Sequence, residues 1–193
     1  MRRNKYNEMP FVVKKTISGI KPFLVMLLIA LLLGWIPIGF ASVVELDFEL
    51  KDMTVPAASS STNTSQAPDN HAEIARTASL APLLRQTLHD RFHTVIITVP
   101  TSRYLSENHS VGYLFDRPQN AANLGSSVNA EWIIVSRLHK PSHLFAYLIS
   151  RLIHVPSGQQ KSEIIIEIKG QQATINQRGI NKLAAKINEQ ISR

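Results

Sequence analysis

Residues 132–169, WIIVSRLHKPSHLFAYLISRLIHVPSGQQKSEIIIEIK, decide the fold because they contain three apolar runs separated by two turn signals. The three runs are Trp132–Leu138, Leu144–Val155 and Ser162–Lys169. Lys140-Pro141 lies between the first two runs and Pro156-Ser157-Gly158 lies between the last two. The runs are rich in Ile, Val and Leu, and connections this short join antiparallel neighbours. The stretch therefore predicts a three-stranded antiparallel meander.

Upstream of this meander, the sequence predicts two further strands. Residues 43–50, VVELDFEL, alternate between apolar and acidic side chains, which is typical of one strand with a single buried face. The apolar face would hold Val44, Leu46, Phe48 and Leu50, and the other face would hold the acids Glu45, Asp47 and Glu49. Residues 93–99 are rich in Val, Ile and Thr and predict the second strand.

Helical periodicity appears in three segments. Residues 72–91 have apolar side chains at steps of three and four, and Pro82 must kink this helix or lie in the first turn of a helix capped by Ser79. Residues 118–128 form a short helix with Pro in its first turn, after a loop with a turn around Tyr104. Residues 180–191 form an amphipathic closing helix.

The order β-α-β-α-β-β-β-α predicts an α/β (α+β) fold. Helical crossovers return to parallel strands, so we expect a mixed five-stranded sheet with helices mainly on one face. Residues 42–193 are long enough for a single domain. Residues 53–71, rich in Ser, Thr, Ala and Pro, predict a flexible surface loop within it.

Residues 1–41 have the layout of a secretory signal peptide. Basic residues precede an uncharged apolar stretch at 23–40, and Gly39 and Ala41 are small residues at the positions before a cut that would leave Ser42 first. An uncleaved inner-membrane anchor at 23–40 is the alternative, although about 27 Å of helix is short for a bilayer core of about 30 Å. Translation from Met1 and from Met9 both fit this layout. Either way, we expect the body in the periplasm.

The net charge of +7 comes mostly from the first 21 residues, which hold six basic residues and one acidic residue. The remaining chain has 15 basic and 13 acidic residues, so a nucleic-acid-binding face is not expected. The chain has no Cys, which excludes disulfides, thiol nucleophiles and Cys-ligated metals. No G-x-S-x-G elbow or phosphate-binding glycine loop is present. We therefore predict no enzyme, no catalytic residues, no cofactor and no resident metal.

Two groups of side chains favour other functions. His89 with His93, and His139 with His143, have a spacing seen in metal sites, and the second pair flanks a turn where its members could converge. A periplasmic metal or small-ligand binder using these histidines is therefore the alternative function. Glu45, Asp47 and Glu49 would lie about 7 Å apart in successive pairs, a spacing any strand with a wet face also gives.

Several segments together resemble a known family. They are VVELDFEL at 43–50, LLRQTL at 83–88, NAEWIIVSRL at 129–138 and KPSHL at 140–144. The chain resembles, over about residues 43–190, the bacterial secreted family catalogued as domain of unknown function 2380, whose outline is similar to the TolB amino-terminal domain. The resemblance implies this fold and an exported location, and it carries over no catalytic residues.

We therefore predict an exported, non-catalytic module that binds another envelope protein. The candidate surfaces are the exposed sheet edge, the loops around Tyr104 and the Ser-rich loop. Membrane contact would occur only through residues 23–40, if the signal is uncleaved. The Asn-x-Ser matches at Asn63 and Asn108 would be unused in a bacterium.

Overall fold

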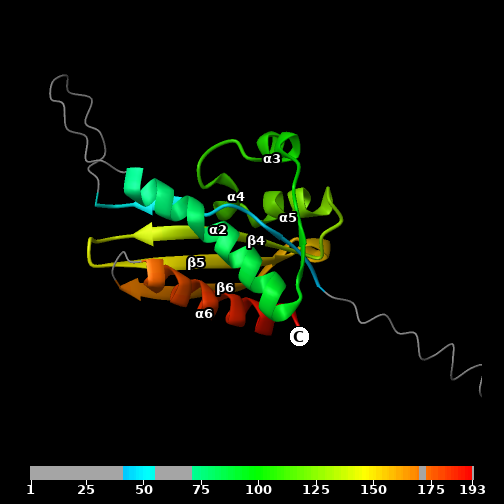
Figure 1. Cartoon of the computed structure of the whole chain (residues 1–193). Coiled ribbons are helices and arrows are strands. Elements are labelled where there is room, and N and C mark those ends of the chain that lie inside the picture. Colours follow the sequence, from blue (N-terminus) through cyan, green and yellow to red (C-terminus); the bar gives the residue numbers. More distant parts are fainter. Residues whose placement is uncertain (1–40, 55–70, 170–172, 193) are drawn as a thin grey trace, which may run out of the picture. The chain divides into compact units, whose positions relative to one another are not determined.

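The computed structural model describes residues 41–54, 71–169 and 173–192, which belong to one compact unit (Figure 1). The predicted signal and most of the predicted Ser-rich loop lie outside these residues. Among the helices that the structure describes, none has the length and apolar character needed to cross a membrane.

The described strands are β1 (Ser42–Glu45), β2 (Glu49–Asp52), β3 (Val95–Ile97), β4 (Trp132–Lys140), β5 (Phe145–His154) and β6 (Gln159–Lys169). The described α-helices are α2 (His71–Phe92), α3 (Thr101–Glu107), α4 (Tyr113–Asp116), α5 (Pro118–Ser126) and α6 (Ala173–Ile191). A single turn of 3-10 helix, Val155–Ser157, joins β5 to β6.

All six strands belong to one mixed sheet with the order β3-β1-β4-β5-β6, and β2 also pairs with β4. Strands β1 and β2 run parallel to β4, β3 runs parallel to β1, and β4, β5 and β6 form the antiparallel meander. The predicted mixed sheet, meander and α+β class are confirmed. The sheet has six strands where five were expected, because residues 43–50 form two strands instead of one.

An extra residue separates these two strands. Glu45 lies opposite Ile134 of β4, and Glu49 lies opposite Arg137. The three residues 46–48 therefore lie opposite only two residues of β4, 135 and 136. A one-residue shift in register moves every later side chain to the other face of a sheet. Residues 46–48 are therefore a bulge, and the prediction of one continuous apolar face over residues 43–50 is wrong.

The helices cover both faces of the sheet. The long helices α2 and α6 pack on one face over a core that includes Val43, Phe48, Leu84, Ile166 and Leu183. The short helices α4 and α5 pack on the opposite face, over a core that includes Val44, Leu46, Phe115, Leu124 and Ile133. The two long helices match the expected one-sided layer. The second layer combines the predicted helix α5 with α4, which lies in the segment 101–117 that was predicted to be mostly loop.

Helix α2 is continuous through Pro82, so the alternative of a helix capped by Ser79 is wrong. The Ser79 hydroxyl instead donates to the carbonyl of Arg76 at 2.6 Å within the helix. The helix ends before His93, which has a φ of 54°. The left-handed conformation of that residue reverses the chain into β3.

A buried chain of charged side chains ties the layers together at one end of the sheet. Lys140 of β4 lies 3.3 Å from Asp52 of β2 and 3.1 Å from Glu73 of α2. Glu73 also pairs with Arg76 at 3.4 Å, and Arg76 donates to the side-chain oxygen of Asn176 in α6 at 2.9 Å. These contacts link four elements that are distant in sequence, and they satisfy charges that burial would otherwise make costly.

Candidate functional site

The site lies where β1 and β3 separate. Strand β1 pairs with β3 only through Ser42–Val44. Beyond this pairing, the segment that follows β1 and the segment that follows β3 diverge. Helix α2 follows the first segment on one face of the sheet, whereas α3 and the other short helices follow β3 toward the opposite face. Such a point at the carboxyl ends of parallel strands leaves a crevice, which is a common place for ligands to bind. We call this crevice the β1–β3 cleft.

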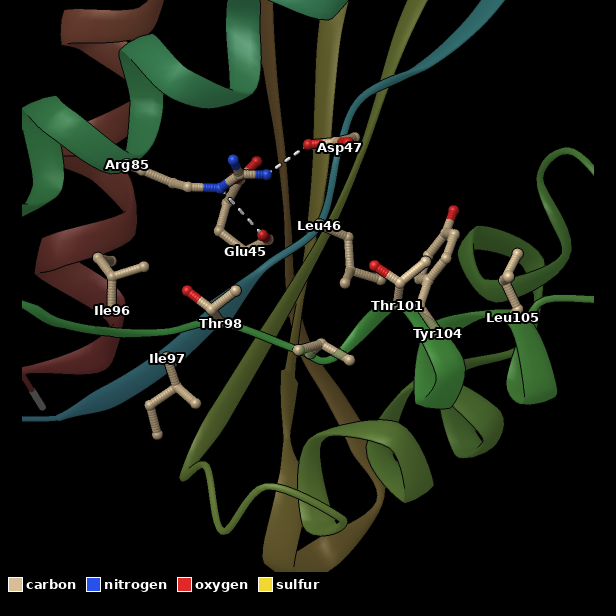
Figure 2. A pocket seen from close by; sticks show the side chains of 11 residues that line it. Glu45, Leu46, Asp47, Arg85, Ile96, Ile97, Thr98, Thr101, Tyr104 and Leu105 are labelled. Atoms are coloured by element: carbon tan, nitrogen blue, oxygen red, sulfur yellow. Dashed lines mark hydrogen bonds and ion pairs between the residues drawn. The ribbon is translucent and has the colours of Figure 1, made fainter.

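A cavity of about 450 Å³ occupies the cleft. One wall is the bulged segment Glu45–Asp47 with Arg85 of α2, and the other is the end of β3 with residues 98 and 99. Helix α3 closes the far side with Thr101, Tyr104 and Leu105 (Figure 2). The cleft therefore joins a charged wall to a largely apolar one.

The charged wall is built around Arg85. Its Nε lies 2.8 Å from Oε2 of Glu45 and donates to the backbone carbonyl of Glu45 at 3.3 Å, while its terminal nitrogen pairs with Asp47. The guanidinium thus occupies the place where β3 no longer pairs with β1. Figure 2 shows Arg85 beside both acidic residues. The Arg85 side chain is 36% exposed and that of Asp47 is 78% exposed.

Glu45 is the buried acid of this wall. Its side chain has no exposed surface, and neither carboxylate oxygen accepts a hydrogen bond, because the Nε–H of Arg85 is directed at the carbonyl oxygen instead. The contact with Arg85 is therefore an electrostatic one. Burial raises the pKa of Glu45 well above its ordinary value; Asp47 adds to the rise and Arg85 opposes it.

The apolar wall is carried by the short helix α3. The Tyr104 hydroxyl accepts a hydrogen bond from the side-chain amide of Asn108 at 2.7 Å, which holds the ring against the cleft. Partial burial raises the pKa of Tyr104. Leu105 lines the cavity and is 64% exposed. Large apolar side chains exposed beside a cavity are typical of a binding surface.

Helix α4 is fixed to the sheet by two arginines. The guanidinium groups of Arg137 and Arg151 lie 4.0 and 4.2 Å from the centre of the Phe115 ring. Arg137 also pairs with Glu49 at 2.8 Å, and Arg151 donates to the carbonyl of Phe115 at 2.7 Å. Stacked cations and ion pairs of this kind anchor a helix too short to be stable alone. These contacts of α4 therefore fix the position of the segment that follows α3.

The three acids of the first segment do not share a face. Glu45 and Asp47 lie beside Arg85 of α2, whereas Glu49, which follows the bulge, pairs with Arg137 beside α4. The predicted row of three carboxylates on one wet face is therefore wrong, because the bulge moves the side chains of β2 to the opposite faces of the sheet. The alternation of Leu and Phe with acidic residues continues through the bulge, so the sequence pattern does not indicate this change of face.

The histidine pairs fall in different surroundings. His139 lies on β4 with its ring stacked on Tyr147 and its Nδ1 buried without a hydrogen-bond partner, whereas His143 is an exposed residue of the β4–β5 turn. His89 contacts Asp90 near the end of α2, and His93 follows the helix. Within residues 41–54, 71–169 and 173–192, no three His, Asp or Glu side chains are grouped as metal ligands would be.

Sequence reasoning missed the two cations that organise the charged clusters, Arg85 and Lys140. Arg85 lies one turn after the buried Ala81 and next to the buried Leu84. That position at the border of an apolar helix face is a signal that the side chain reaches a neighbouring strand. The strand was expected to end at Leu138, two residues before Lys140. Lys140 was therefore not expected to be buried within the sheet.

Comparison with known proteins places the chain in a family. It belongs to the family described as protein of unknown function (DUF2380), whose model matches residues 41–187. This confirms the resemblance seen in the sequence. No curated protein matches the chain.

Several solved structures are similar to this chain at low sequence identity. The hypothetical protein CT253 from Chlamydia trachomatis has a TM-score of 0.50 and 10% identity, covering 79% of this chain and 98% of that chain. The LpoB C-terminal domain from Salmonella enterica has a TM-score of 0.44 and 16% identity, covering 75% and 93%. Lipoprotein GNA1162 from Neisseria meningitidis has a TM-score of 0.44 and 12% identity, covering 79% and 97%. At these identities the comparison concerns the fold alone.

Proposed function

We propose that the chain is an exported, non-catalytic envelope protein that binds a partner protein at the β1–β3 cleft. The observation that carries the proposal is the cleft itself, a cavity of about 450 Å³ whose lining includes the exposed apolar side chain of Leu105. The export of the body is supported by the basic and apolar layout of residues 1–41.

A partner segment in extended conformation suits this cleft. On the side facing away from β4, residues 45–52 have no paired strand among the described residues, since β3 pairs only with Ser42–Val44. Main-chain groups at such an edge accept an added strand, and neighbouring pockets select its side chains. An apolar side chain of the partner would enter the cavity between Ile97 and Tyr104, and a polar one would meet Asp47.

Catalysis is less well supported by the same geometry. Glu45 is the acid with the raised pKa, a feature of many general acids, but its carboxylate is fully buried beside Arg85. A general acid must reach the proton acceptor of its substrate directly or through one water molecule. The buried position of Glu45 favours a structural role, in which Arg85 and Glu45 shape the cleft wall.

The test uses the full chain as bait in an envelope extract of its own host, followed by affinity measurements with the purified partner. We expect Leu105→Asp and Tyr104→Ala to weaken binding by tenfold or more, because both remove apolar contact at the centre of the cleft. Lys186→Ala, on the exposed side of α6, is the matched control and should bind as the wild type does. Unchanged affinity in both cleft variants would reject the proposal.

A further inference from the structure

Strand β6 is a long edge of the sheet, and its centre carries no charged side chain. It has 11 residues, ends the strand order, and pairs only with β5 among the described residues. Natural proteins protect such edges with short strands, prolines, bulges, charged side chains or a covering helix or loop. Strand β6 contains no proline, its irregularity lies opposite Leu152/Ile153 near its start, and its centre is Ile164-Ile165-Ile166. Ile165 is 51% exposed on the outer face.

We propose that β6 pairs with β6 of a second copy of this chain, antiparallel and centred on Ile166, so that two sheets become one. In this register Ile164 of each copy lies opposite Ile168 of the other on the inner face. Glu163 of each copy lies opposite Lys169 on the outer face. This pairing is symmetric about a two-fold axis, so both copies contribute the same residues, as in a closed dimer.

Charge and side-chain type select this register over its neighbours. Centring the pair on Ile165 would place Glu163 opposite Glu167 and two lysines opposite each other, and like charges directly opposite are destabilising. Centring it on Ile164 would place Ile168 opposite Gln160 and Ile166 opposite Ser162. Only the register centred on Ile166 joins Ile to Ile on the inner face and Glu to Lys on the outer face.

The charged side chains are accessible for this pairing. The Lys169 side chain is 81% exposed and contacts Glu167 of its own strand at 3.2 Å. The Glu163 side chain is 35% exposed and uses Oε2 to accept from Arg151 at 2.7 Å. A second cation can approach the other oxygen, since a carboxylate has about four acceptor sites. On the same face, Ile165 of one copy lies directly opposite Glu167 of the other and diagonally across from its Ile165.

The absence of cysteine in the sequence allows a direct test by disulfide formation. The double variant Glu163→Cys/Lys169→Cys of the full chain is treated with a mild thiol oxidant. Six residues along one strand separate these positions by about 20 Å, so a disulfide within one chain is impossible. We expect the double variant to form covalent dimers at least tenfold faster than either single variant.

The control pair Lys161→Cys/Glu167→Cys samples the register centred on Ile164. Faster cross-linking of this pair, or equal rates in all variants, would overturn the proposed pairing. Charge reversal gives a second readout in sedimentation equilibrium. Glu163→Lys should weaken the dimer roughly tenfold, and adding Lys169→Glu should restore it to within about threefold of the wild type. Failure of the second change to restore association would also contradict the register.

Discussion

At the scale of single residues, Glu45 makes stability depend on pH in an unusual direction. An unfolded glutamate has a pKa of about 4.3, and burial raises the pKa of Glu45 in the fold. Between these two pKa values the folded state holds a proton that the unfolded state has lost. Stability from this residue is therefore present below about pH 4.3 and is lost as pH rises through the folded pKa, at up to about 1.4 kcal/mol per pH unit.

We predict that Glu45→Gln removes this loss. Urea unfolding between pH 4 and pH 8 should show the variant gaining stability relative to the wild type as pH rises, with the smallest difference near pH 4. The exposed Glu131→Gln is the control and should follow the wild type at every pH. Parallel curves for Glu45→Gln and wild type would mean that Glu45 is ionised to the same extent in both states.

Lys140 gives a second prediction at the residue scale. Its ammonium group neutralises Asp52 and Glu73, whose side chains are 4% and 9% exposed. The Asp52 pKa is lowered because hydrogen bonds from Thr54 and Lys140 outweigh the effect of burial. Lys140→Met should therefore lower the free energy of unfolding by about 3 kcal/mol, since two buried carboxylates lose a partner. Lys51→Met, at an exposed site on β2, should change stability by less than about 0.5 kcal/mol in the same denaturation assay.

At the scale of elements, the packing of α6 on the meander depends on a close approach at Gly179. A Cβ there would lie 2.7 Å from Cγ2 of Ile168 and 3.1 Å from Cδ1 of Leu148. Alanine favours a helix over glycine by about 1 kcal/mol, but overpacking costs about 1–3 kcal/mol. We predict that Gly179→Ala lowers the free energy of unfolding, measured by thermal denaturation, by roughly 1 kcal/mol. Arg178→Ala, at the exposed neighbouring position, should leave it within about 0.5 kcal/mol, and a stabilised Gly179→Ala would show that α6 lies farther from β6.

The elements differ in how far their sequence determines them. The meander, α5 and α6 follow apolar periodicity and turn residues that act locally, so they were predictable. The bulge at residues 46–48 was not, because its register depends on β4, more than 80 residues later. Helices α3 and α4 were not predicted either, since their stability depends on tertiary contacts such as Phe115 between Arg137 and Arg151.

The same reason explains what was missed at the site. Tyr104 was identified as part of a candidate binding loop, and it does line the cleft. Arg85 was not identified, because its importance arises only where β3 leaves β1 and an unpaired carbonyl of Glu45 needs a donor. The functional site is thus a product of strand order, which single-segment patterns do not contain.

At the scale of the whole molecule, the strand order places two surfaces at opposite ends of the sheet. The β1–β3 cleft lies at the β3 end, and the open edge of β6 lies at the other. A dimer formed through β6 would therefore leave both clefts free, so that one dimer presents two partner-binding sites. Two linked sites bind a clustered partner more tightly than one site does.

The central claim is that the β1–β3 cleft is the surface that binds a partner. Its most direct test places a photo-cross-linking residue at Leu105 of the full chain in living host cells, with Lys186 as the matched control position. We predict one discrete adduct of constant mass from position 105, absent from position 186 and abolished by Tyr104→Ala. Identical adducts from both positions, or none from position 105 while position 186 gives one, would contradict the assignment of the cleft.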